Sequence, residues 1–218
     1  MQNLIITIDG PTASGKTTIA KKLSENLGIF HLKGGIFLRS TTLFCLNNNI
    51  RIHSHIAKAS EQLDLKVVLN NRAEFSLYLE DLDVSNKLWN REIDSFVPEI
   101  ANIPRVRIAR KKWLITVAKG RDLVADGRTL GSEIFPNASY KFFLTCSLEE
   151  RAKRRAMQDN YVGNLSSIKN DISARDRKDM EGLVNRLQPP DNAINIDSTN
   201  LSINSVIDQM MQYIKCKS

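Results

Sequence analysis

Nine residues near the start of the chain, Gly10-Pro11-Thr12-Ala13-Ser14-Gly15-Lys16-Thr17-Thr18, contain the pattern Gly-x-x-x-x-Gly-Lys-Thr. The apolar run Leu4–Ile8 comes just before them and an amphipathic stretch follows, so we expect a loop between a strand and a helix. A loop with glycine at both ends can point its backbone N–H groups at a phosphate, and the dipole of the next helix favours the negative charge. A plain structural turn is the alternative, but the flanking pattern favours phosphate binding.

Two side chains of this loop have specific expected roles. Lys16 can reach the outer phosphates of a nucleotide as a point charge, and the Thr17 hydroxyl can bind Mg²⁺. We therefore expect the nucleotide-binding residues to be Gly10, Pro11, Thr12, Ala13, Ser14, Gly15, Lys16, Thr17 and Thr18.

Length and composition set the class of protein. The chain has 218 residues, of which 42% are hydrophobic and 25% charged, as is ordinary for one soluble α/β domain. A run of about 18 apolar residues would be needed to span a membrane, and the sequence contains none. No export signal is visible, and the three cysteines are far apart, so we expect thiols in a reducing cytoplasm rather than disulfides or zinc ligands.

The formal net charge is +7 and the sequence pI is about 9.4. Most of the lysines and arginines are scattered along the chain, which favours polyanionic small molecules over nucleic acid as partners.

Apolar runs alternate with helical patterns along most of the chain. This alternation predicts a three-layer α/β/α fold with a parallel sheet, whose ligands bind at the carboxyl ends of the strands. A hairpin over 65–79 interrupts it, which suggests an inserted antiparallel unit. Residues 158–169 are polar and are expected to be mobile.

The pattern predicts strands at 4–9, 29–32, 65–69, 74–79, 82–84, 123–126, 140–145 and 193–197. It predicts helices at 17–27 (ending at Gly28), 39–46 and 106–118, one after Ser147 and one from Ser202.

Transfer of a phosphoryl group needs cations, so arginines are the next candidates. Arg128 stands out because it follows a strand end in Asp126-Gly127-Arg128, whereas any other single arginine is as easily a solvated surface residue. Asp126 can approach Mg²⁺ through water, hold the loop, or simply cap its strand, and Asp9 has the same ambiguity. The other candidates are Arg39, Arg107, Arg151, Arg154, Arg155, Arg175 and Arg177.

The charged run Arg175–Asp179 admits two interpretations. It can be an exposed helix with ion pairs one turn apart, such as Arg175 with Asp179. It can also be part of a lid that closes over phosphates and excludes water. Its position after a polar segment favours the lid.

Further short motifs occur in one order along the chain: Ile8-Asp9-Gly10-Pro11, Asp126-Gly127-Arg128, Phe142–Thr145, Glu149–Ala152, Arg154-Arg155, Arg175-Asp176 and Ile196–Ile203. Together they resemble the bacterial cytidylate (CMP/dCMP) kinase family of P-loop nucleoside monophosphate kinases. The resemblance covers nearly the whole chain and implies the reaction ATP + (d)CMP ⇌ ADP + (d)CDP with Mg²⁺. It also implies a single domain over 1–218, with a core of about 1–60 and 105–218, an NMP-binding insert of about 61–104 and a lid of about 154–180.

The acceptor half departs from the family pattern. Lys33 and Gly34 replace an acidic residue and a hydroxyl, and Thr129 replaces a carboxylate linked to cytosine recognition. Pro98 replaces a serine also linked to base reading, and Gly182 replaces the last arginine of the lid. Because a hydroxyl accepts a hydrogen bond more weakly than a carboxylate, base selectivity is expected to be altered.

The resemblance assigns roles residue by residue. Lys16, Arg128 and Arg175 are expected to be catalytic, and Thr17 to hold the metal. The acceptor-binding residues are Arg39, Arg107, Arg128, Thr129, Arg175 and Asp179. Three functions remain open: a cytidylate-type kinase, which we favour, a kinase of another small acceptor, and a nucleotide-binding protein without turnover. We expect a monomer that handles small nucleotides.

Overall fold

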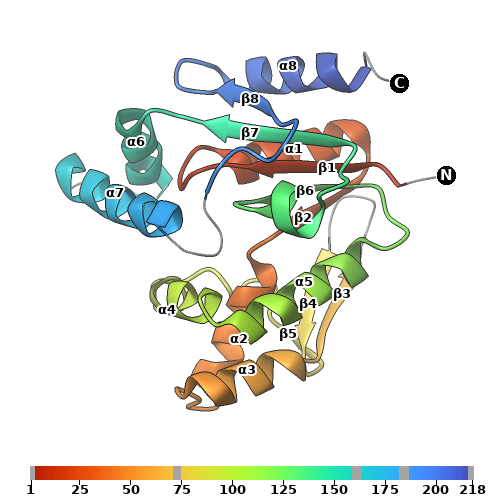
Figure 1. Ribbon diagram of the computed structural model, residues 1–218, viewed down its shortest axis with the longest axis vertical. Coiled ribbons are helices and arrows are strands. Elements are labelled where there is room, and N and C mark those ends of the chain that lie inside the picture. Colours follow the sequence, from red (N-terminus) through yellow and green to blue (C-terminus); the bar gives the residue numbers. More distant parts are fainter. Residues whose placement is uncertain (1–2, 71–74, 159–163, 182–186, 216–218) are drawn as a thin grey trace.

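Five parallel strands form the central sheet of the computed structural model, which describes residues 3–70, 75–158, 164–181 and 187–215 (Figure 1). The strands lie in the order β2-β6-β1-β7-β8, so β1 is central. Their bounds are β1 (Ile5–Asp9), β2 (Phe30–Lys33), β6 (Leu123–Gly127), β7 (Tyr140–Thr145) and β8 (Ile194–Asp197).

Helices cover both faces of this sheet, as β6 shows. Val124 points to one face, where it packs with residues of α1 (Lys16–Leu27) and α8 (Ile203–Lys215). The next residue, Ala125, points to the other face and packs with Leu114 of α5 (Pro104–Ala118) and with Leu130 of the short π-helix η1 (Leu130–Ile134). Both faces of a parallel strand are buried in such an arrangement. The predicted three-layer α/β/α fold is confirmed.

Glycines set both ends of α1. Gly15 precedes the helix and Gly28 follows it, and both adopt left-handed backbone conformations, with φ of 91° and 65°. That region strongly favours glycine, and Gly28 ends the helix as the sequence predicts.

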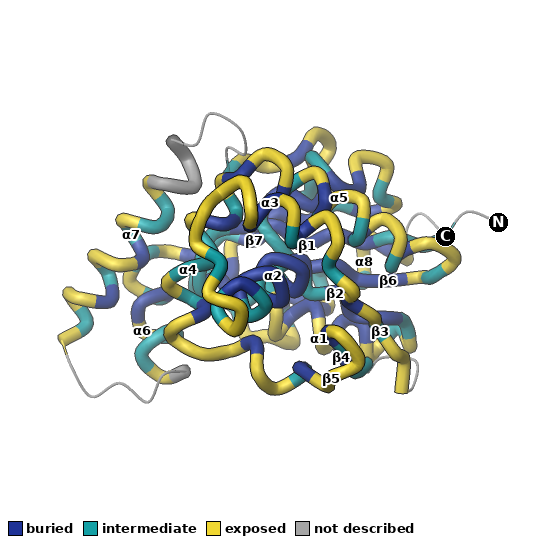
Figure 2. Tube along the Cα trace, turned by 90° about the horizontal axis from the view of Figure 1, so that it is seen from below, coloured by how far each residue is buried: buried dark blue, intermediate teal, exposed yellow. Residues whose placement is uncertain are grey.

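A second unit lies below the sheet in Figure 1. Its antiparallel strands β3 (Leu65–Leu69), β4 (Phe75–Leu79) and β5 (Leu82–Asp83) confirm the predicted hairpin and third strand. Strands β3 and β4 share one apolar cluster with α2 (Ile36–Asn47), α3 (His53–Glu61), α4 (Arg91–Ala101) and α5. Figure 2 shows α2 mostly dark blue, because it is buried within this cluster. The boundaries near residues 61 and 104 stay a prediction.

Two helices stand beside the carboxyl ends of the strands, α6 (Leu148–Gln158) and α7 (Leu165–Glu181) (Figure 1). Of the segment 158–169 predicted to be mobile, residues 165–169 form the start of α7, while 159–163 lie outside the described residues; its mobility stays a prediction. Ile168 and Ile172 of α7 pack on Ala152 of α6, and this contact stabilises the helix. The lid bounds of 154–180 stay a prediction.

Other local predictions missed helices. The helix predicted from Arg39 begins at Ile36, because the first turn of α2 is already buried. Neither α3 nor α4 was predicted. The side chain of Asn90 caps α4 by accepting a hydrogen bond from the Ile93 N–H at 2.9 Å. Pro98 lies inside this helix, and a proline in the sequence argues against a helix there. In the described part of the chain, every helix is too short or too polar to cross a lipid bilayer.

Candidate active site

The glycine loop follows β1 at the carboxyl edge of the sheet. Gly10 has φ of 154°, and a Cβ atom on it would lie 2.1 Å from the carbonyl oxygen of Leu144 in β7. Only glycine therefore fits this close approach between loop and strand. At the other end of the loop the Gly15 carbonyl accepts the N–H of Ile19, which joins the loop directly to α1.

Lys16 folds back over the loop. Its Nζ donates to the Pro11 carbonyl at 2.5 Å and to the Ser14 hydroxyl at 3.3 Å. Burial lowers the pKa of Lys16 to about 8, with the charge of Arg128 acting in the same direction and those of Asp126 and Asp9 against it. A cation that is costly to bury in this way is well suited to bind an incoming phosphate.

Asp126 lies between two side chains from different elements. One carboxylate oxygen accepts the Thr17 hydroxyl at 2.7 Å, and the other lies 2.7 Å from Nε2 of His31 in β2. The side chains of His31 and Asp126 are only 5% and 8% exposed. Asp126 therefore holds the start of α1. Sequence reasoning missed His31, since a single histidine in a strand carries no motif.

The oxygens of Thr17 and Asp126 also suit a magnesium ion. Mg²⁺ prefers oxygen ligands, keeps several waters, and usually takes one or two protein groups together with substrate phosphates. A hydroxyl beside a carboxylate at the end of the phosphate loop is a donor set of this kind, so the residues present fit the metal.

Asp9 has a structural role. Its carboxylate accepts the N–H groups of Leu130 and Gly131 at 2.9 and 2.7 Å. Burial raises its pKa, while these two hydrogen bonds act in the opposite direction. Asp9 therefore fixes the start of η1, which resolves its ambiguity in the sequence.

Arg128 lies against the loop, where its Nη2 donates to the Thr12 hydroxyl at 2.5 Å. Burial lowers its pKa to about 10, and the neighbouring charge of Arg175 adds to that effect. Arg175 of α7 is partly buried, and burial lowers its pKa as well. The two predicted catalytic arginines are thus close enough to repel each other, and a bound phosphate would relieve this repulsion.

Arg39 is held by residues near the start of α4. It donates to the Leu88 carbonyl at 2.8 Å and forms an ion pair with Asp94 at 2.5 Å. Its guanidinium lies 4.3 Å from the ring centre of Trp89, and the Lys33 ammonium lies 4.8 Å from the same ring. Trp89 and Asp94 were not singled out from the sequence.

Arg107 and Thr129 share a different partner. Glu133 accepts from Arg107 at 3.0 Å through one oxygen and from the Thr129 hydroxyl at 3.2 Å through the other. Neither Arg107 nor Thr129 is among the described residues that line the cavity of about 790 Å³ beside the glycine loop.

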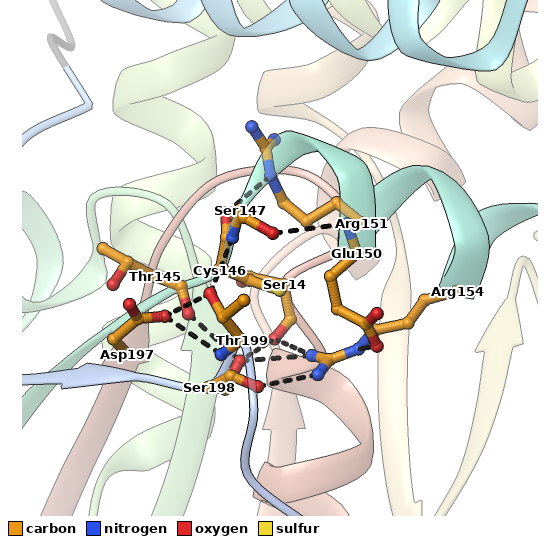
Figure 3. Close-up of polar contacts among 10 residues, drawn as sticks. All are labelled: Ser14, Thr145, Cys146, Ser147, Glu150, Arg151, Arg154, Asp197, Ser198 and Thr199. Carbon is orange, nitrogen blue, oxygen red and sulfur yellow. Dashed lines mark hydrogen bonds and ion pairs between the residues drawn. The ribbon is translucent and has the colours of Figure 1, made fainter. Parts of the chain in front are cut away.

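Two arginines of α6 bind the loop from the other side. Arg151 donates to the Thr12 carbonyl at 3.2 Å and pairs with Asp176 of α7. Arg154 donates to Ser198 and to the Ser14 carbonyl, and Figure 3 shows its guanidinium between these two residues. These two arginines are therefore site residues.

The rest of the charged run behaves differently. Arg177 is exposed on α7, as the surface interpretation predicts. The side chain of Asp179 and all of Gly182 lie outside the described residues.

A cavity of about 790 Å³ joins the loop to the second unit. The loop and α1 line one side, Arg39, Trp89 and Asp94 another, and Ser198, Leu201 and Ile203 a third. This volume is in the range of small-molecule sites, and the cavity has cations along two of its sides.

A parallel sheet, a phosphate loop before α1 and helices bearing arginines beside the loop define a P-loop kinase. More closely, the chain belongs to the cytidylate kinase family, because the family profile described as cytidylate kinase matches residues 6–216. Similar proteins include cytidylate kinase 1 of Haemophilus influenzae, 38% identical and aligned over 97% of this chain and 94% of that protein. The cytidylate kinase of Pasteurella multocida is 37% identical over 97% of this chain and 95% of its own length.

Solved structures support the fold alone. An uncharacterized protein of Eubacterium ventriosum is 14% identical, with a TM-score of 0.54 over 98% of this chain and 99% of that one. A shikimate kinase of Bacteroides thetaiotaomicron is 10% identical, with a TM-score of 0.51 over 97% of this chain and 98% of that one.

Proposed function

We propose that this protein transfers the γ-phosphoryl group of ATP to CMP and dCMP, forming ADP and the nucleoside diphosphate. The observation that carries the proposal is the cavity that connects the phosphate loop to Arg39 and Trp89 in a member of the cytidylate kinase family. The loop lines one region of this cavity, proposed for the donor phosphates, and Arg39 with Trp89 lines another, proposed for the acceptor.

The donor phosphates are proposed to lie on the loop, Gly10–Thr18, where the backbone N–H groups and the helix dipole favour them. Lys16 leaves its contact with the Pro11 carbonyl and binds the outer phosphates. Thr17, oriented by Asp126, would hold Mg²⁺, which neutralises phosphate charge when bound.

The acceptor is proposed to lie between the sheet and the second unit, bound by Arg39, Arg107, Thr129 and Asp179. Arg128 and Arg175 stabilise the charge on the phosphoryl group as it moves between the two phosphates. Helices α6 and α7 cover the loop and restrict the entry of water, which limits loss of the phosphoryl group to hydrolysis.

A coupled assay of ADP formation tests the proposal with CMP, dCMP, UMP, AMP, GMP and dTMP as acceptors. Turnover is expected with CMP and dCMP, and Lys16→Ala is expected to lower kcat by about 10²- to 10³-fold, as for loss of one charge-stabilising group. Absence of turnover across the whole panel would contradict the proposed function. ATP binding without turnover would indicate a nucleotide-binding protein that is not a kinase. Turnover with a non-nucleotide acceptor alone would indicate a kinase of another small molecule.

The finer assignments of place and assembly are also proposals. The buried free thiols of Cys45 and Cys146 suit a reducing cytoplasm. We expect a monomer of 24.6 kDa, which size-exclusion chromatography with light scattering can test.

A further inference from the structure

The short π-helix η1 gives Glu133 a fixed position beside the acceptor residues. The Glu133 N–H donates to the Thr129 carbonyl at 2.9 Å, so its side chain returns over Thr129. The Asp9 carboxylate accepts the N–H groups of Leu130 and Gly131 at the start of the same turn. A Cβ atom on Gly131 would lie 2.7 Å from the Thr7 hydroxyl, so the turn lies tight against β1. Glu133 therefore stands on a rigid support.

Two groups orient the Glu133 carboxylate. Arg107 lies 3.0 Å from one oxygen and the Thr129 hydroxyl 3.2 Å from the other. Arg110, which donates to the Gly34 carbonyl at 3.2 Å, is a further positive charge nearby: burial lowers its pKa, and the negative charge of Glu133 acts in the opposite direction. The Glu133 side chain is still 30% exposed. A carboxylate has about four acceptor positions, so it can take a further hydrogen bond from a ligand.

We propose that Glu133 is the specificity-determining carboxylate that reads the base of the acceptor nucleotide. This inference rests on the proposed function. It states that the amino group of cytosine donates a hydrogen bond to the Glu133 carboxylate. Thr129 stands where the family resemblance leads us to expect a carboxylate, and Glu133 brings one to 3.2 Å from its hydroxyl. The negative charge near this position therefore comes from Glu133, four residues after Thr129, rather than from residue 129 itself.

The chemistry predicts which base is selected. The exocyclic amine of cytosine donates hydrogen bonds, and an ionised carboxylate can only accept them, so the two are complementary. Uracil has a carbonyl oxygen at the same position, and two acceptors facing each other repel. A hydrogen bond to a charged group contributes enough to discriminate about 10- to 100-fold between two such ligands.

The test compares Glu133→Gln with the wild-type protein in kcat/KM for CMP and for UMP. The amide keeps the size of the side chain and can donate to the uracil carbonyl. The ratio of CMP to UMP is expected to fall about 10- to 100-fold. Glu150→Gln is the matched control, because Glu150 also pairs with an arginine, Arg154, at 3.0 Å and is 32% exposed. It lies on α6, beside the donor phosphates, and should leave the ratio unchanged.

The result that would overturn the proposal is a loss of activity that is equal for CMP and UMP, since Glu133 would then only position Arg107. Glu133→Asp provides a second variant, which keeps the charge but is too short to reach both partners, and should lose part of the discrimination. Thermal shifts with CMP or UMP beside a non-hydrolysable ATP analogue report the same preference without turnover. They distinguish a failure of this inference from a failure of the proposed kinase activity.

Discussion

Arg151 of α6 and Asp176 of α7 form an ion pair with 2.5 Å between Nη1 and Oδ2, and their side chains are only 9% and 15% exposed. The same guanidinium donates to the carbonyls of Thr12 and Cys146. One side chain therefore links the phosphate loop, the end of β7 and the helix that carries Arg175. The position of α7 over the site depends on this arginine.

Arg151→Met should release that link. Removing one partner of a buried pair leaves the other charge uncompensated, so the free energy of unfolding is expected to fall by about 3 kcal/mol. Amide hydrogen exchange in α7 should accelerate more than exchange in the central sheet. Chemical denaturation and exchange measured by mass spectrometry check the two effects.

A second ion pair between the same helices serves as the control. Lys169 of α7 contacts Glu149 of α6, but these side chains are 33% and 52% exposed. Lys169→Met should therefore cost less than about 1 kcal/mol and leave exchange in α7 nearly unchanged. Equal effects of the two variants would show that burial of Arg151 is not what holds α7.

His31 is predicted to act as a positioning residue through Asp126. A carboxylate only accepts, so Nε2 of His31 donates to it and leaves the other oxygen for Thr17. Glutamine can place an amide near the Nε2 position, whereas asparagine is one carbon shorter. His31→Asn should raise the Mg²⁺ concentration for half-maximal rate about tenfold, and His31→Gln should largely restore it.

Thermal denaturation adds a reading that does not depend on turnover. With ATP present, the further rise in Tm on adding Mg²⁺ should shrink in His31→Asn and return in His31→Gln. Thr7→Val is the control, because this buried hydroxyl on β1, the strand beside β6, has no hydrogen-bond partner among the described residues. If asparagine and glutamine behave alike in both measurements, His31 serves the core rather than Thr17.

The sequence predicted the glycine loop and its place between β1 and α1, because the geometry of this loop is local. The loop from Gly10 to Thr18 takes its shape from its own glycines and from the strand and helix beside it. The central sheet was predicted for a similar reason, since buried parallel strands are continuous apolar runs. Long-range pairing is different. Nothing near Arg151 in the sequence indicates that its partner is Asp176, 25 positions away on another helix.

The surroundings of Arg39 and Arg107 were predicted less completely, because they come from several elements. Trp89 and Asp94 belong to no motif, and the proline in α4 hid the helix that places them. Glu133 was also missed. Its contact with Thr129 depends on the π-helical turn, which is rare and leaves little signal in a sequence.

The thiol of Cys45 should lose its proton only at high pH. Burial raises its pKa to about 11, and its side chain is 3% exposed. Between pH 9 and 11 the unfolded chain loses this proton while the folded protein keeps it, so the free energy of unfolding falls as pH rises. The contribution lost is on the order of 2 kcal/mol. Denaturation of wild type and Cys45→Ala across this range should show the difference between them changing by that amount, and a constant difference would contradict it.

Trp89 is expected to help bind the acceptor, because its aromatic ring holds the cationic side chain of Arg39 in the cavity. Its ring lies 4.3 Å from the Arg39 guanidinium and is 48% exposed. Trp89→Leu removes this contact while Arg39 keeps its ion pair with Asp94. The KM for CMP should rise about threefold to tenfold with little change in kcat, and Trp89→Phe should retain most of the affinity.

A matched contact on α4, the helix that follows Trp89, separates this role from general support of that helix. Phe96 lies 4.5 Å from the Arg51 guanidinium, and neither residue lines the main cavity. Phe96→Leu should leave the KM for CMP unchanged. The sequence has two tryptophans, so in Trp113→Phe the fluorescence of Trp89 alone should respond to CMP. A response to ATP but not to CMP would place Trp89 on the donor side, and an equal rise of KM in Trp89→Leu and Phe96→Leu would assign both rings to the stability of α4.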